Sequence, residues 1–438
     1  MKANQVLKNA KWIIVCKIAQ SIIQLIIGML CARYLGPSNY GLINYAASIV
    51  AFALPLMKLG FDATLVRELV EDPDREGEIM GTSLFLNLIS GVACIFGVSA
   101  FAALANRGST ETIIICLLYS ISIFFASIEM IQYWFQYKLL SKFSSLVMLF
   151  AYFVVSIYKV FLLAFSKSVY WFSVSHSIEY GLIGVLLVFI YFRCGGQRLS
   201  FSADKARKML SKSKHYILAS LMIVVIQNTD HIMLTTMIGS AENGFYSAAI
   251  TCVTVVQFVY VAIVDSFRPY ILSLKKENEK EYERNVSRVY SVTLYMAIAQ
   301  CIFFTLFARL IVYVLYGSGY YATIPILRIL VWYFIFSLIG LVRNVWILAE
   351  EKQKYLWIIN LTGAVLNIIL NLIMIPLWGA CGAAIASLLT QFFANFVLSF
   401  IIKPLRRNNV LLLRALDPRC LIHDLKWAFM QVKKKKAS

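Results

Sequence analysis

Charged side chains inside long apolar stretches are the residues of this sequence best suited to do chemistry. Six of them are basic: Lys17, Lys159, Arg268, Arg309, Arg328 and Arg343. Four are acidic: Glu129, Glu179, Asp230 and Asp265. If the stretches cross a bilayer, each buried charge costs about 2.5–3.5 kcal/mol on insertion scales. Charges retained at that cost predict a binding site for a charged cargo, a pathway for ions, or both.

The basic residues favour an anionic cargo such as a phosphate, because each can offer it a charge-assisted hydrogen bond. Snorkelling is the alternative, since long side chains near an interface can extend their charge to the headgroups. The acids are too short to snorkel easily. Asp230 lies deepest in its stretch and next to His231, so it is the leading candidate for proton or sodium coupling. Structural pairing with a basic residue is equally compatible with the pattern.

Catalytic, metal and cofactor motifs are weak. His176 and Glu179 are three residues apart, a spacing seen in metal sites, but no further ligands complete a set of four. Asp72-Pro73-Asp74 resembles the acidic motif of glycosyltransferases, yet it lies in a short acidic connection without a nucleotide-binding fold. The nine cysteines are scattered and form no CxxC pair. We therefore expect no metal, no cofactor and no enzymatic activity.

The elements that position these charges are long apolar helices. The 438-residue chain is 60% hydrophobic and 14% charged, with a mean hydropathy of +0.75, which excludes an ordinary soluble protein. Strands are not expected, because open sheet edges cannot be satisfied in lipid. Apolar runs of spanning length predict an all-α polytopic membrane protein with twelve transmembrane helices, near 12–34, 41–59, 79–104, 112–135, 143–165, 169–192, 215–238, 244–267, 289–315, 323–348, 354–376 and 379–402.

The distribution of lysine and arginine predicts the orientation. Most of the 41 basic residues fall on one side, above all in the connection from Arg193 to Lys214 and in the tail, whereas the other side carries only Arg33, Arg107 and Lys167. Basic loops are retained in the cytoplasm, so both termini are expected there. This asymmetry explains the net charge of +19 without a nucleic-acid partner. The terminal KKKKAS could bind anionic lipid or simply be solvated.

With this orientation the six basic residues form two tiers. Lys17, Arg268 and Arg343 lie toward the cytoplasmic end of their helices. Lys159, Arg309 and Arg328 lie toward the outer end. A phosphate would meet a cationic partner before and after crossing the membrane.

The chain divides into two related halves. We expect a first six-helix lobe over residues 1–200, a second over 201–405, and a basic cytoplasmic tail over 406–438. A shift of 203 residues aligns LGPSNYGLINYAAS (35–48) with IGSAENGFYSAAIT (238–251), and matches Gly36 to Gly239 and Gly41 to Gly244. Two six-helix halves enter the membrane from the same side, an arrangement that favours a transporter with alternating access.

Five blocks of the sequence carry a resemblance: ARYLGPSNYGLINYAA, LGFDATLVRE (59–68), NTDHIML (228–234), LYGSGYYATIPILRIL (315–330) and LNIILNLIMIPLWGACGAAIAS (366–387). Together they resemble the bacterial polysaccharide repeat-unit flippases, the oligosaccharide flippase family of the multidrug/oligosaccharidyl-lipid/polysaccharide exporter superfamily. The resemblance spans nearly the whole chain. It implies a two-lobed bacterial inner-membrane protein whose cavity is lined by crossings one, two, seven and eight.

The resemblance further implies a flippase that moves undecaprenyl-pyrophosphate-linked oligosaccharides from the cytoplasmic to the outer leaflet for O-antigen or capsular polysaccharide assembly. Membrane lipid, a polysaccharide polymerase and chain-length machinery are the expected partners. A drug antiporter of the same superfamily is the main alternative, although six intramembrane bases favour an anionic cargo. A membrane glycan polymerase or glycosyltransferase is a weaker alternative, because every outer connection is short.

Overall fold

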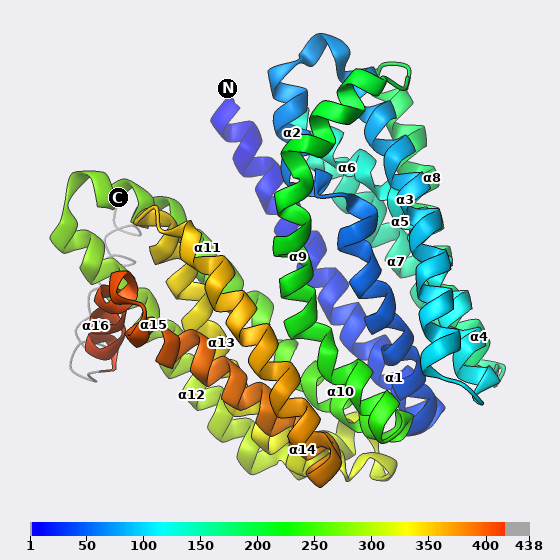
Figure 1. The fold of residues 1–438 in the computed structure, drawn as a ribbon, viewed down its shortest axis with the longest axis vertical. Coiled ribbons are helices and arrows are strands. Elements are labelled where there is room, and N and C mark those ends of the chain that lie inside the picture. Colours follow the sequence, from blue (N-terminus) through cyan, green and yellow to red (C-terminus); the bar gives the residue numbers. More distant parts are fainter. Residues whose placement is uncertain (1, 417–438) are drawn as a thin grey trace, which may run out of the picture. The chain divides into compact units, whose positions relative to one another are not determined.

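Helices account for all regular structure in the computed structural model, which describes residues 2–416 of the chain (Figure 1). The chain divides into two compact units, Met1–Ser247 and Ala248–Ser438. This boundary falls later than the predicted lobe boundary, because the helix Ala203–Met237 packs on the first unit. The division into lobes at 200/201 stays a prediction. The terminal KKKKAS lies outside the described residues.

Within its described residues, the first unit contains nine α-helices, two 3-10 turns and the start of a further helix. These elements are α1 (Lys2–Lys58), α2 (Phe61–Glu71), η1 (Pro73–Arg75), α3 (Glu76–Ala105), α4 (Thr110–Ser120), α5 (Ser122–Ile128), η2 (Glu129–Ile131), α6 (Gln132–Tyr137), α7 (Ser141–Ala164), α8 (Val169–Arg193), α9 (Ala203–Met237) and the beginning of α10 (Ser240–Thr254). The helix α9 begins at a capped end, where the Ser202 hydroxyl accepts a hydrogen bond from the Lys205 backbone N–H.

The second unit continues from α10. Its elements are α11 (Gln257–Glu277), α12 (Glu279–Tyr316), η3 (Ser318–Tyr320), α13 (Thr323–Ala349), η4 (Gln353–Tyr355), α14 (Leu356–Phe392), the π-helix η5 (Phe393–Val397), α15 (Leu398–Ile401), η6 (Lys403–Leu405) and α16 (Arg406–Ala415). Asn278 caps α12 by accepting from the Glu281 backbone N–H, and Gly317 ends it with φ 85°.

Most of these helices are long and apolar enough to span a membrane. Within residues 2–416, ten helical stretches are long and apolar enough to cross a bilayer. Two of the ten contain non-helical backbone, at Gly36 (φ 72°) and at Gly379 (φ 56°). Gly36 lies between two crossings that the sequence predicts as separate, and Gly379 is the first residue of the last predicted crossing. The chain is therefore an all-helical multi-pass membrane protein. The count of twelve and the cytoplasmic position of the termini stay predictions.

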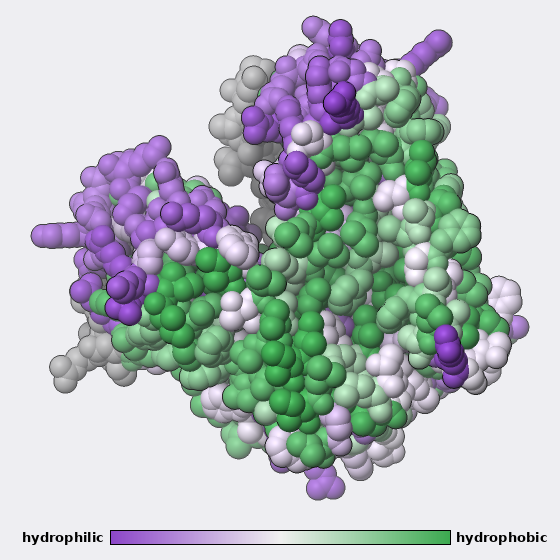
Figure 2. All heavy atoms as spheres, in the orientation of Figure 1, coloured by the Kyte–Doolittle hydropathy of each residue, from purple (hydrophilic) through white to green (hydrophobic). Residues whose placement is uncertain are grey.

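The surface of each unit fits this environment. Hydrophilic residues gather at the ends of the helices, while apolar residues cover their sides (Figure 2). The large apolar side chains Phe96, Val185 and Leu306 are 71%, 68% and 68% exposed. Exposure on this scale marks a lipid-facing surface rather than a water-facing one.

Candidate functional site in the first unit

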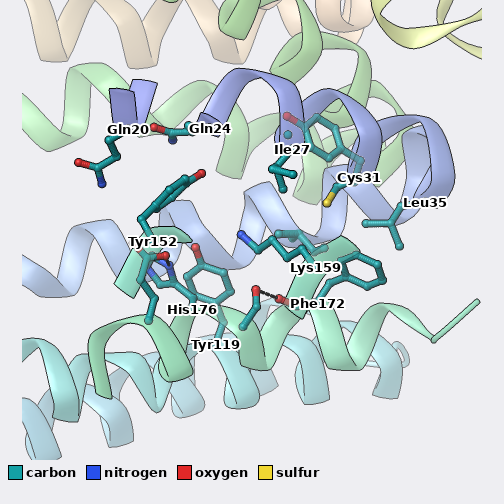
Figure 3. A pocket seen from close by; sticks show the side chains of 15 residues that line it. Gln20, Gln24, Ile27, Cys31, Leu35, Tyr119, Tyr152, Lys159, Phe172 and His176 are labelled. Atoms are coloured by element: carbon teal, nitrogen blue, oxygen red, sulfur yellow. Dashed lines mark hydrogen bonds and ion pairs between the residues drawn. The ribbon is translucent and has the colours of Figure 1, made fainter. Parts of the chain in front are cut away.

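A cavity of about 260 Å³ lies among α1, α4, α7 and α8 of the first unit. Its apolar wall is part of the unit's core, since Ile27, Cys31 and Leu35 of α1 are buried beside it. Its polar side chains are Gln20, Gln24, Tyr40, Tyr119, Tyr152, Lys159, Ser175, His176 and Glu179 (Figure 3). The cavity thus combines an ammonium, a carboxylate, an imidazole and two amides inside a membrane-spanning unit.

One face of α1 supplies the longest wall. Gln20, Gln24, Ile27, Gly28, Cys31 and Leu35 follow each other at helical intervals. Residues spaced in this way share one side of a helix. The two glutamines lie at one end of the stripe, where Gln20 is half-buried and Gln24 is exposed. Sequence reasoning missed both, although two amides four residues apart in an apolar helix were a signal that could have found them.

Lys159 is the only lysine or arginine, among the residues that the structure describes, that lines this cavity. It lies on α7, is half-buried, and points its ammonium into the space between α1 and the facing helices (Figure 3). No ion pair joins it to an acid among residues 2–416. The Glu179 carboxylate lines the same cavity and interacts with Lys159 only through the field between their charges. An intramembrane ammonium without an ion-pair partner is costly, so it has capacity left for an anionic ligand.

Glu179 and His176 face the same cavity from α8. The His176 Nδ1 atom lies 3.9 Å from Glu179 Oε2, and the side chains are 28% and 12% exposed. The imidazole is stacked on Tyr119, with ring centroids 4.6 Å apart, and meets the edge of Tyr180. These aromatic contacts fix the ring orientation. The pair can exchange a proton with a ligand or water in the cavity.

The arrangement brings together two of the ten charged residues that the sequence predicts, Lys159 and Glu179. A carboxylate and an ammonium in one cavity can hold an anion and a proton in turn, because neutralising one charge changes the field on the other. Within residues 2–416, no three histidine, cysteine or acidic side chains gather into a group able to hold a metal ion. The chemistry open to this site is binding and proton exchange.

Asp230 lies in a different environment, a buried polar network of α9 and α10. Its carboxylate accepts a hydrogen bond of 2.5 Å from the Tyr246 hydroxyl. The neighbouring His231 Nδ1 is 2.7 Å from Asn243 Oδ1, and Asn243 Nδ2 donates to the Gly41 carbonyl at 2.8 Å. This network connects α9, α10 and α1, and Asp230 does not line the cavity.

The remaining predicted acids have local partners. Asp265 forms an ion pair of 2.6 Å with Arg268 one turn along α11, and both side chains are about half exposed. Glu129 accepts a hydrogen bond of 3.1 Å from Gln132. Asp265 and Arg268, predicted for different roles, therefore neutralise each other here.

The other predicted cations are dispersed. Lys17 and Arg328 are exposed on α1 and α13, and the Arg309 guanidinium lies 6.0 Å from the centre of the Tyr321 ring. Arg343 is buried in the second unit, where it donates to the Ala394 carbonyl at 3.1 Å. Its role as a cargo ligand stays a prediction.

Comparison with known proteins identifies the family. The family profile described as "Polysaccharide biosynthesis protein" matches residues 6–275. The chain is 22% identical to the capsular polysaccharide biosynthesis protein CapF of Staphylococcus aureus over 400 residues, which cover 88% of this chain and 96% of that protein.

Solved structures share the fold. The lipid II flippase MurJ in an inward closed conformation has a TM-score of 0.70 at 17% identity, covering 94% of this chain and 92% of that one. An inward-facing multidrug resistance MATE family transporter of the MOP superfamily has a TM-score of 0.68 at 14% identity, covering 90% and 95%. At these identities the likeness concerns the fold alone. The family match covers more than half of the chain, and the chain belongs to the polysaccharide biosynthesis protein family.

Proposed function

We propose that this member of the polysaccharide biosynthesis protein family is a flippase for undecaprenyl-pyrophosphate-linked oligosaccharides. It transfers the repeat unit from the cytoplasmic to the outer leaflet of a bacterial inner membrane by alternating access, for O-antigen or capsule assembly. The family match and the likeness to a capsular polysaccharide biosynthesis protein support this assignment. The multi-pass helical fold supports a transporter rather than an enzyme.

The observation that carries the proposal is the Lys159 ammonium in the cavity of the first unit, which pairs with no acid among residues 2–416. A lipid-linked oligosaccharide presents a pyrophosphate, which must be sheltered from the bilayer core during transfer. Lysine is a point-charge ligand for phosphate. The ammonium thus supplies the charge that this cargo requires.

The size of the cavity limits what it holds. Drug-sized ligand pockets measure about 300–1,000 Å³, and this cavity of about 260 Å³ is too small for a whole oligosaccharide. We infer that it is a subsite for one part of the cargo. The pyrophosphate lies at Lys159, and hydroxyls of the first sugar meet the amides of Gln20 and Gln24, while the lipid tail stays in the bilayer.

Glu179 is the acid that this cavity favours for ion coupling. It faces the same space as Lys159, so arrival of the pyrophosphate raises the local negative charge and favours uptake of a proton by Glu179 or His176. Asp230, Asp265 and Glu129 have hydrogen-bond or ion-pair partners outside this cavity. A polysaccharide polymerase and chain-length machinery would receive the flipped unit.

Transfer in reconstituted vesicles tests the proposal. The purified protein is placed in proteoliposomes with a fluorescent undecaprenyl-pyrophosphate-linked oligosaccharide, and accessibility of the sugar to an external enzyme reports its leaflet. Protein-dependent transfer supports the assignment. Absence of transfer, together with export of cationic drugs from the same vesicles, would support the antiporter alternative instead.

A further inference from the structure

Two glycine-flanked segments of the first unit pack directly against each other. The first, residues 37–41, follows the break in α1 at Gly36, where φ is 72°. The second, residues 240–244, opens α10 after Gly239, where φ is 141°. Both breaks place a glycine in the left-handed region that other residues rarely adopt. The repeat shift aligns the two glycines, so the same break occurs at the same place in both repeats.

The contacts between these segments are reciprocal. A Cβ on Gly41 would overlap the Ser240 carbonyl, and a Cβ on Gly244 would overlap the Pro37 carbonyl. The shift of 203 residues that equates Gly41 with Gly244 also equates Pro37 with Ser240. The contact of Gly41 with Ser240 and the contact of Gly244 with Pro37 are therefore the same contact, made once in each direction. Such a pattern is the mark of a local two-fold axis, and it supports the alignment of the repeats independently of their few identities.

Polar side chains also join the two segments. The Ser38 and Ser240 hydroxyl oxygens are 2.8 Å apart, and Asn243 Nδ2 donates to the Gly41 carbonyl at 2.8 Å. Asn243 is fully buried and is oriented by His231 through a 2.7 Å hydrogen bond. At Gly41 and Gly244 the two segments meet backbone to backbone, so closely that one added carbon atom would hold them apart.

We propose that residues 37–41 and 240–244 form a glycine latch that closes the outer end of the transport pathway and parts in each cycle. This inference rests on the proposed function, because only a cargo that leaves between the repeats requires the latch to open. In the predicted topology both segments lie toward the outer side. Gly41 and Gly244 are needed for closure, and Asn243, held by His231, positions the Gly41 carbonyl.

A reversible cross-link tests the latch. In the Ser38→Cys, Ser240→Cys double variant, the replaced hydroxyls are close enough for a disulfide to form with little movement. We expect oxidation to cross-link most of the protein, to lower oligosaccharide transfer at least tenfold, and to be reversed by a reductant. Each single cysteine variant, treated identically, controls for the native cysteines. Full transfer by the cross-linked form would overturn the proposal.

Glycine variants test closure without any transport measurement. Gly41→Ala or Gly244→Ala, made in the double-cysteine background, should lower the cross-linking yield at least threefold, because the added methyl holds the segments apart. Gly97→Ala is the matched control, since a Cβ there meets nothing within 4 Å. An unchanged yield in Gly41→Ala and Gly244→Ala would contradict the latch. If the yield responds as expected but no variant transfers oligosaccharide in either redox state, the proposed function fails while the closing contact stands.

Discussion

Lys159 in the first unit and Arg343 in the second are the most informative pair of residues to compare. Both are basic residues inside apolar helices, and sequence reasoning gives both the same role. Lys159 is half-buried and reaches a cavity without an acid partner in the described part of the chain. Arg343 is only 2% exposed and donates to the Ala394 carbonyl and, at 3.5 Å, to the Ser399 hydroxyl. The difference is that one cation faces free space and the other faces backbone.

The backbone that Arg343 contacts is unusual. Residues Phe393–Val397 form a π-helix, which shifts hydrogen bonds from the α-helical pattern, and the Ala394 carbonyl within it accepts the hydrogen bond from Arg343. Gly340, three residues before Arg343 on α13, packs against the Asn395 side chain so closely that a Cβ would lie 2.6 Å from its Oδ1. Gly340 and Arg343 together accommodate the π-helix. An intramembrane cation can therefore serve packing as well as cargo.

The largest effect is expected for Lys159→Ala. Removing the ammonium removes the phosphate partner of the cavity, so transfer of lipid-linked oligosaccharide should fall at least tenfold while protein abundance and thermal stability stay near those of the parent. Lys159→Arg retains the charge with a different geometry and should keep part of the activity. Proteoliposome transfer and complementation of surface polysaccharide provide the measurements.

Lys167→Ala is the control for Lys159→Ala, because Lys167 is exposed beyond the end of α7. If Lys159→Ala transfers cargo as well as Lys167→Ala does, the ammonium is not a cargo ligand. The proposed difference between Lys159 as a cargo ligand and Arg343 as a packing residue would then be wrong.

For Arg343→Ala we expect a loss of stability instead. The substitution leaves the Ala394 carbonyl and the Ser399 hydroxyl without this donor and opens a cavity in the second unit, at a cost of about 2–4 kcal/mol. Thermal unfolding of the detergent-solubilised protein should show the loss. Transfer per folded molecule should stay within about twofold of the parent, and a tenfold fall at unchanged stability would give Arg343 a direct role in binding.

A pair of glycine substitutions sharpens the same comparison. Gly340→Ala forces its methyl against Asn395 and should cost about 1–3 kcal/mol of stability, as overpacking generally does. Gly28→Ala adds a methyl where nothing lies within 4 Å, on a helix wall of the cavity. It should leave stability unchanged or raise it by up to about 1 kcal/mol and narrow the cavity. Unfolding temperatures that fall equally in both variants would contradict the packing described here.

The apolar runs predicted the helical fold well because each run needs only local information. The break at Gly36 falls between two separately predicted crossings, and the break at Gly379 falls at the first residue of the last one. The helices α9 and α12 extend past their predicted crossings, since α9 already begins at Ala203 and α12 at Glu279. Hydropathy marks only the part of a helix that suits lipid, and a charged, capped turn continues the same helix into water.

The site was less predictable, because it depends on which helices are neighbours. Lys159 on α7 and Glu179 on α8 were each candidates from depth and charge alone. Their meeting in one cavity with Gln20 of α1 requires the packing of three helices that no periodicity specifies. The ion pair of Asp265 with Arg268, by contrast, could have been predicted, since residues three apart share a helix face.

The smallest effect is expected for Glu350→Gln, which lies between membrane-spanning stretches of the second unit. Burial raises the pKa of Glu350, but the hydrogen bond from Lys275 at 2.6 Å and the charges of Lys275 and Lys352 outweigh it, so the pKa lies below its ordinary value. A lowered pKa stabilises the folded state above the unfolded pKa of about 4.3, and the benefit is lost as pH falls through the folded value. At pH 7, Glu350→Gln should therefore cost about 1 kcal/mol. The gap to the parent should begin to narrow in thermal unfolding as the pH falls below about 4.3 and should vanish only below the folded-state pKa. Glu351→Gln, at an exposed neighbour, should show no gap at any pH. A gap that stays constant down to the lowest pH at which the parent still folds would mean that Glu350 acts through shape rather than charge, as Gly340 does.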